Sequence, residues 1–82
     1  MNEQHHAQLL VLFGQRLASC RQVQKLSQVQ LATRSGIEFG NLGKYELGKR
    51  EPGLATIMIL AKGLEIDPRD LLDFPFEFEN RV

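Results

Sequence analysis

The stretch GIEFGNLGKYELGKREPG, residues 36–53, carries five of the seven glycines and is the first candidate for chemistry. Within it, GKYELGKR follows the phosphate-binding pattern G-x-x-x-x-G-K-[ST], except that Arg50 replaces the hydroxyl that would hold magnesium. Such a loop must also follow a buried strand and start a helix. Here the preceding residues are EFGN, and Pro52 restricts any helix that would start at Lys49. The sequence therefore argues against a nucleotide site.

The imidazoles and the thiol are the next candidates. His5 and His6 are adjacent, so on a helix they would point about 100° apart and could not hold one metal ion. Near the N-terminus we expect both to be solvated. Cys20, the single cysteine, falls among apolar helix positions, which predicts a buried thiol rather than a nucleophile. One cysteine cannot form a disulfide within the chain, which suits a reducing compartment.

The carboxylates show no catalytic pairing. Asp67, Asp70 and Asp73 are spaced by three residues, which is typical of a helix cap followed by a solvated face. No two carboxylates stand in a setting that predicts general acid–base catalysis. The sequence therefore predicts no enzyme, no metal site and no cofactor.

Composition and charge limit the fold and the partner. Hydrophobic residues make up 43% of 82 residues, which is enough for one small core and one domain. The sequence contains no long apolar run that would span a membrane and no basic region of a signal peptide, so we expect a cytoplasmic protein. Residues 1–50 carry seven Lys and Arg against three acids, whereas residues 51–82 carry three against seven. This asymmetry favours an anionic partner for the first half.

Helical signals dominate the chain. Apolar spacing predicts a first helix at about residues 8–22, and Ser27, Gln30 and Gly36 mark the two ends of a second. Asp67 and Pro68 start a last helix. A helix after Pro52 is expected to face the core with Leu54, Ile57, Met58, Ala61 and Leu64.

The second helix and the one after it are spaced as a helix-turn-helix. Two steeply crossing helices need a small residue at the crossing, a glycine at the bend and apolar anchors on the second helix. The sequence supplies these in order as Ala32, Gly36, Ile37, Leu42 and Tyr45. The second helix of the motif is predicted at Phe39 to Leu47.

At these residues the sequence resembles the phage repressor and Cro (Xre-type) helix-turn-helix family. The resemblance covers residues 12–74 and rests on Ser27-Gln28, Leu31-Ala32, Gly36, Glu46, Gly48 and Pro52. It implies an all-α, five-helix, lambda repressor-like domain that binds operator DNA, usually as a dimer. We expect residues 1–82 to be one such domain, with a core at about 8–74 and a short tail at 75–82.

The resemblance also implies residue roles. Gln28 would contact a DNA phosphate, Arg21 and Glu46 would form a structural ion pair, and Lys49 and Arg50 would lie in the loop along the DNA backbone. The sequence departs from the family in three places. Ser35 replaces an apolar residue, Ile59 replaces a polar one, and the recognition helix contains Gly40 and Gly43.

Residues near the start of a recognition helix reach the edges of the bases. Their chemistry nominates Glu38, Phe39, Asn41 and Lys44 for reading bases. Glu38 could instead cap the helix, and Phe39 could instead fold onto the protein.

Gly40 and Gly43 each cost about 1 kcal/mol relative to alanine inside a helix. Tertiary packing could simply tolerate that cost. Alternatively, the missing Cβ atoms could let the helix backbone approach DNA closely. The candidates for phosphate contacts are Gln28, Arg34, Lys49 and Arg50.

We therefore expect a small transcriptional regulator, a repressor or an autoregulator, that binds double-stranded DNA sequence-specifically. It would act as a homodimer on a pseudo-palindromic operator, without a membrane or small-molecule partner. The antitoxin and restriction–modification controller contexts remain open, as does a protein-interaction module of the same fold that does not bind DNA. The dimer candidates are Ile59, Leu72, Phe74, Phe76 and Phe78, although the tail could instead pack on its own core.

Overall fold

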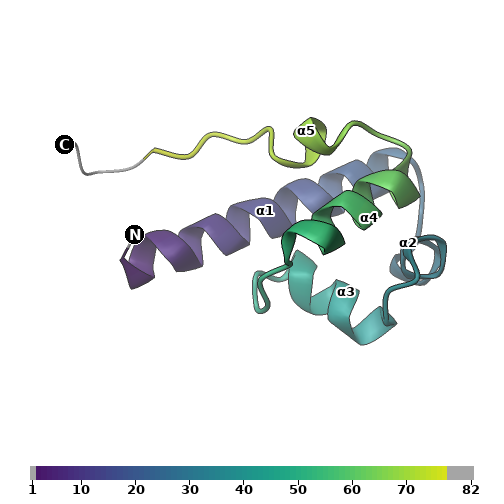
Figure 1. Cartoon of the computed structure of the whole chain (residues 1–82), viewed down its shortest axis with the longest axis horizontal. Helices are drawn as coiled ribbons and strands as arrows, with labels where there is room; N and C mark the ends of the chain where they lie inside the picture. The colour runs from purple at the N-terminus through teal and green to yellow at the C-terminus, as the bar shows by residue number, and fades with distance from the viewer. Residues whose placement is uncertain (1, 78–82) are drawn as a thin grey trace.

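The computed structural model describes residues 2–77, which form five helices and no strand. The helices are α1 (Glu3–Val23), α2 (Gln28–Ser35), α3 (Phe39–Glu46), α4 (Leu54–Leu64) and α5 (Pro68–Leu71). The long α1 runs the length of the molecule, and the segment after α5 returns along α1 toward its N-terminal end (Figure 1). The all-α, five-helix fold predicted from the sequence is confirmed.

The first helix begins five residues earlier than predicted, because Asn2 caps it by accepting a hydrogen bond from the backbone N–H of His5 at 2.8 Å. The expectation that both histidines are solvated is wrong for His5, which is buried. The rings of His5 and Phe76 are nearly perpendicular, with an interplanar angle of 86° and centroids 6.5 Å apart. His6 is exposed, and its Nε2 lies 2.8 Å from Oε1 of Glu51. The burial of His5 depends on the returning segment, which local spacing does not reveal.

One core joins the helices. It consists of Phe13, Leu17, Leu26, Leu31, Ala32, Leu42, Tyr45, Leu60, Ala61, Leu64 and Leu71, with partly buried neighbours that include Cys20, Ile37 and Phe74. At the crossing of α1 and α3, a Cβ on Gly14 would lie 2.6 Å from the carbonyl oxygen of Tyr45 and would also collide with the carbonyl oxygen of Glu46. Glycine is therefore what allows α1 to approach the end of α3.

The crossing of α2 and α4, like that of α1 and α3, leaves no room for a Cβ at its glycine. A Cβ on Gly63 would collide with the hydroxyl oxygen of Ser35 and would lie 3.3 Å from Cδ1 of Leu31. Ser35 is buried, and its Oγ has no hydrogen-bond partner in the described part of the chain. A polar atom therefore occupies a position where the resemblance noted from the sequence implies an apolar side chain.

The buried face of α4 differs from the predicted one. Leu60, Ala61 and Leu64 are buried, whereas Leu54 and Met58 are 77% and 50% exposed. The helix sequence LATIMILAKGL is apolar on most sides, so helical spacing alone could not select the inward face. The helices that α4 packs against, α2 and α5, make that selection.

Candidate nucleic-acid interface

Helix α2 has a cap at each end, and both caps are formed by the residues that the sequence predicts. Oγ of Ser27 accepts from the backbone N–H of Gln30 at 3.0 Å, and Oε1 of Gln30 accepts from the backbone N–H of Ser27 at 2.7 Å. This is the predicted capping box. Gly36 then takes the left-handed conformation with φ of 66°, and the backbone N–H of Ile37 donates to the carbonyl of Ala32 at 3.0 Å. The direction of the chain into α3 follows from this turn.

Helix α3 presents one apolar face to the core and the opposite face to solvent. Leu42 and Tyr45 are buried, as the helix-turn-helix spacing predicts. Leu42 anchors the first half of the helix and Tyr45 the last turn. Helix α3 ends at Glu46, one residue before the predicted end.

An ion pair joins α3 to α1. Arg21 donates from Nε to Oε2 of Glu46 at 2.7 Å and from Nη2 to Oε1 at 3.0 Å. A third bond runs from Nη1 to the carbonyl of Leu26 at 2.7 Å. The two side chains are only 12% and 6% exposed, so each charge needs the other. The hydrogen bond to Glu46 raises the pKa of the Arg21 guanidinium above its ordinary value.

Gln28 joins this network. Its Nε2 donates to Oε1 of Glu46 at 2.9 Å, which orients the amide at the start of α2. One N–H and the oxygen of that amide remain available to a further partner. The carboxylate of Glu46 therefore positions both the end of α3 and the side chain at the start of α2.

The solvent face of α3 carries several of the predicted base-reading residues. Phe39 is 53% exposed, so it does not fold onto the protein, and Lys44 is also exposed. Glu38 stands at the N-cap position, but its side chain makes no capping hydrogen bond. Leu47, which sequence reasoning did not include in the site, is 64% exposed just after α3.

Gly40 and Gly43 open this face. A Cβ on Gly43 would meet nothing within 4 Å, and one on Gly40 would meet only Oε1 of Glu38 at 3.5 Å, an ordinary contact. Packing within the described chain therefore does not require either glycine. Gly14 and Gly63 differ in this respect, since protein atoms occupy the space where their side chains would be.

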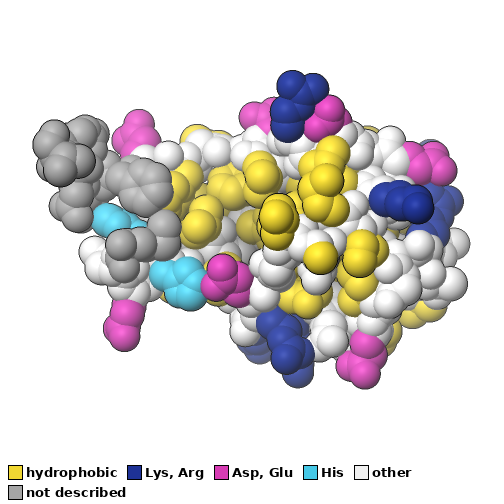
Figure 2. All heavy atoms as spheres, viewed as in Figure 1, with side chains coloured by type: hydrophobic (Ala, Val, Ile, Leu, Met, Phe, Trp, Pro, Cys, Tyr) yellow, Lys and Arg dark blue, Asp and Glu magenta, His cyan; other side chains and the backbone are white. Residues whose placement is uncertain are grey.

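The loop after α3 is bonded back to the helix. Gly48 has φ of 73°, and the backbone N–H of Lys49 donates to the carbonyl of Lys44 at 2.9 Å. Nη1 of Arg50 donates to Oδ1 of Asn41 at 2.5 Å. The sequence analysis assigned Asn41 to base reading and Arg50 to phosphate contact, whereas the structure joins the two side chains by a hydrogen bond. Basic side chains appear at the edge of the molecule where this loop lies (Figure 2).

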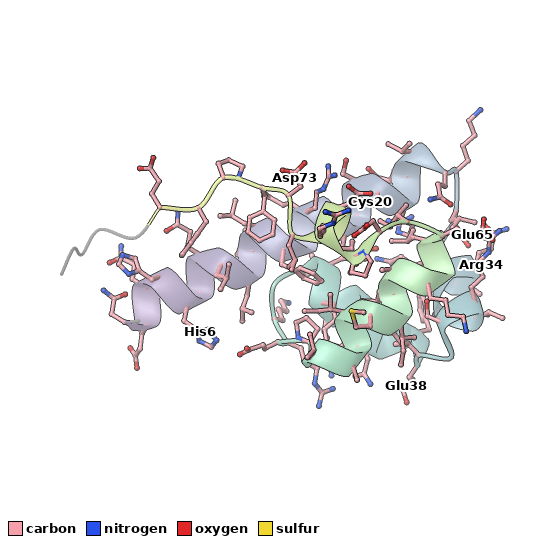
Figure 3. The ribbon with its side chains drawn as sticks, turned by 45° about the horizontal axis from the view of Figure 1, so that its top comes forward. His6, Cys20, Arg34, Glu38, Glu65 and Asp73 are labelled. Carbon is pink, nitrogen blue, oxygen red and sulfur yellow. The ribbon has the colours of Figure 1, made fainter. Side chains whose placement is uncertain are left out.

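The predicted phosphate set is not gathered in one place. Lys49 and Arg50 share the loop after α3, and Gln28 is tied to the end of α3 through Glu46. Arg34 instead lies at the C-terminal end of α4, where its Nη1 is 3.4 Å from the carbonyl oxygen of Gly63. Figure 3 shows Arg34 beside Glu65 and apart from Glu38.

A second surface is apolar. Figure 2 shows hydrophobic side chains gathered over α4, α5 and the segment that follows. Ile59 and Leu72 are 43% and 53% exposed, Phe74 packs partly on the core, and Phe76 is partly buried beside His5. Phe78 lies outside the described residues. A shallow apolar groove on this surface is lined by Met58, Ile59, Ala61, Lys62, Ile66 and Pro68.

The remaining candidates for chemistry are the metal-ligating side chains and the thiol of Cys20. Within residues 2–77, no three His, Cys, Asp or Glu side chains are grouped so that they could hold a metal ion. No helix there is long and apolar enough to cross a membrane. Cys20 is partly buried, and that burial raises the pKa of its thiol.

The comparisons with known proteins point to one family. A family model described as Helix-turn-helix (HTH_3) matches residues 17–71. The chain is similar to YonR, a prophage-derived HTH-type transcriptional regulator of Bacillus subtilis, with 41% identity over 61 residues, 74% of this chain and 56% of YonR. It is similar to the HTH-type transcriptional repressor RghR of the same organism, with 41% identity over 61 residues, 73% of this chain and 45% of RghR. The chain thus spans about half the length of these relatives.

Solved structures share the fold. The restriction-modification controller protein C.AhdI of Aeromonas hydrophila is 45% identical, with a TM-score of 0.75 over 76% of this chain and 94% of that one. The clp gene regulator ClgR of C. glutamicum is 25% identical, with a TM-score of 0.75 over 78% of this chain and 83% of that one. The likeness to C.AhdI therefore extends over nearly its whole chain.

Proposed function

The chain belongs to the HTH_3 helix-turn-helix family, and we propose that it is a transcriptional regulator that binds double-stranded DNA with α3 in the major groove. The observation that carries this proposal is the construction of α3. Its inner face is fixed to the core by Leu42 and Tyr45 and to α1 by the Arg21–Glu46 pair. Its outer face is open, since no other part of residues 2–77 fills the space beside Gly43.

The outer face of α3 fits base edges. Phe39 would contact a thymine methyl group, Lys44 would donate to guanine, and Asn41 would bond a base from the first turn. Glu38, whose side chain does not cap the helix, would accept from cytosine. At Gly40 and Gly43 the helix backbone itself would approach the DNA.

Phosphate contacts would flank this face. Lys49 and Arg50 would follow the backbone on one side, and Gln28 with the first backbone amides of α2 would bind a phosphate on the other. The amide of Gln28 is already oriented by Glu46, so little side-chain entropy would be lost on binding. Arg34 has the weakest support in the predicted set, because it lies at the far end of α4.

A homodimer would double the contact with DNA. The apolar surface over α4 and α5, with Ile59 and Leu72 exposed, is the proposed interface. Two-fold symmetry would place the two α3 helices about 34 Å apart, so the operator would be pseudo-palindromic. The likeness to C.AhdI over nearly its whole chain makes a restriction–modification controller the narrower regulatory role that we propose.

Selection of bound sequences from a random duplex pool, followed by a salt titration on the enriched site, tests this proposal. We expect a symmetric site and an affinity that falls steeply with salt concentration. Lys49→Ala should reduce the slope of that dependence by about one and weaken all sequences alike, whereas Lys44→Ala should relax one position of the site. Absence of binding at low salt would instead favour a protein-interaction module of the same fold.

A further inference from the structure

Asn41 and Arg50 are nine residues apart and belong to different elements, yet Nη1 of Arg50 lies 2.5 Å from Oδ1 of Asn41. Asn41 is in the first turn of α3, and Arg50 is in the loop that follows the helix. We propose that Arg50 is a positioning residue that sets which edge of the Asn41 amide faces the DNA. This inference rests on the proposed DNA binding.

The chemistry of the pair defines the orientation. An arginine side chain carries five N–H donors and no acceptor, so only the oxygen of the Asn41 amide can face it. The NH2 group of Asn41 is then directed away from Arg50. Without this partner, the half-buried amide of Asn41 could rotate by half a turn about its last bond and present either edge.

The presented edge predicts a base preference. In the major groove, guanine offers N7 and O6 as acceptors, adenine offers N7 and thymine offers O4, whereas cytosine offers only the N4 donor. An NH2 group held outward can bond the first three bases and finds no acceptor on cytosine. Asn41 therefore discriminates against cytosine as long as Arg50 holds its oxygen.

The residues around Asn41 in α3 leave its side chain without competitors for this base. Gly40 precedes it and Gly43 follows two residues later, so neither provides a side chain that could take over the same base. Arg50 uses one of its five donors on Asn41, and the others remain for a phosphate. Anchoring on the DNA backbone and reading of a base are then coupled through one hydrogen bond.

The test is selection from a random duplex pool with the wild type, Asn41→Ala, Arg50→Ala, the double variant and Lys49→Ala as the matched control. In Arg50→Ala, we expect the factor by which cytosine is disfavoured at one position to fall about three- to tenfold. This is the range expected for the loss of one hydrogen bond. Asn41→Ala and the double variant should lose the same discrimination at the same position. Lys49→Ala removes a charge from the same loop without a bond to Asn41, so it should keep the preference.

Two further measurements separate positioning from charge. In the free protein, Arg50→Ala should shift the NMR resonances of the Asn41 side-chain amide, and Lys49→Ala should not. Arg50→Lys keeps the charge and carries only N–H donors, as arginine does, so it should restore part of the preference. If Arg50→Ala weakens all sequences equally and keeps the discrimination, the positioning role is overturned while DNA binding stands. If the wild type enriches no duplex at low salt, both proposals fail.

Discussion

Arg21 and Glu46, which are 25 residues apart, are joined by two hydrogen bonds of 2.7 and 3.0 Å. This pair connects the last turn of α1 to the last turn of α3. Glu46 also accepts from Gln28 at 2.9 Å, so one carboxylate holds side chains from α1 and α2 against α3. The orientation of the proposed recognition helix therefore depends on a buried charge at the end of that helix.

Removing this carboxylate should destabilise the fold. Glu46→Ala leaves the guanidinium of Arg21 without its partner, and we expect a loss of about 3 kcal/mol in the free energy of unfolding, the lower end for a buried ion pair. The bond from Arg21 to the carbonyl of Leu26 keeps the loss at that lower end. Urea unfolding of the wild type and Glu46→Ala measures this loss in the free energy of unfolding. The exposed pair of Asp67 and Arg69 provides the control, since Arg69→Ala should leave the midpoint unchanged. Equal effects of the two substitutions would contradict a structural role for Glu46.

The glycines of the chain should divide into two classes. Gly43→Ala adds a methyl group with no packing neighbour within 4 Å in the described part of the chain, so it should raise the stability of the helix by about 1 kcal/mol. Gly14→Ala should destabilise by about 2 kcal/mol or more, because the methyl group meets the backbone of α3. Thermal unfolding measures both changes. If close approach to DNA is the reason for Gly43, the more stable variant should bind its operator less tightly. An unchanged affinity would mean that packing merely tolerates this glycine.

Ser35 and Gly63 should be energetically coupled. Ser35→Ala removes a buried hydroxyl that has no partner among residues 2–77, so we expect a gain of about 1 kcal/mol in stability. Gly63→Ala should destabilise the wild type because its methyl group would collide with that hydroxyl. In the Ser35→Ala background the same change should cost less, and a double-mutant cycle in urea measures the difference. Strict additivity would show that the two positions are independent.

Charge on the apolar surface should dissociate the proposed dimer. Leu72→Lys places an ammonium group in the interface, so sedimentation should show a monomer whose helical circular dichroism is unchanged. Val23 is 78% exposed at the end of α1, and Val23→Lys is the matched control that should remain dimeric. A Leu72→Lys variant that sediments as the wild type would place the interface elsewhere.

The thiol of Cys20 should react slowly in the folded protein. Burial raises its pKa, so at a given pH a smaller fraction is thiolate than in the unfolded chain. The rate of alkylation by iodoacetamide should therefore reach half its maximum at a higher pH in buffer than in urea. Mass spectrometry over a pH series follows this rate. A half-maximum at the same or a lower pH in buffer would mean that the thiol is not desolvated.

The sequence by itself determined the features that depend on neighbouring residues. The capping box of Ser27 and Gln30, the left-handed Gly36 and the start of the last helix at Pro68 were predictable, because each involves groups only a few residues apart. The inward face of α3 was also predictable, since Leu42 and Tyr45 are its main apolar anchors. The Arg21–Glu46 pair was implied by the family resemblance and not by local chemistry.

Only the tertiary structure decided which apolar faces are covered and which polar groups meet. The face of α4 was ambiguous because most of its sides are apolar, and packing against α2 and α5 left Leu54 and Met58 exposed. His5 is buried because a segment from the other end of the sequence returns beside it. The bond between Asn41 and Arg50 exists because the turn at Gly48 brings the loop back to the first turn of α3. Helical spacing in the sequence does not predict any of these contacts. Each depends on the path of the chain in three dimensions.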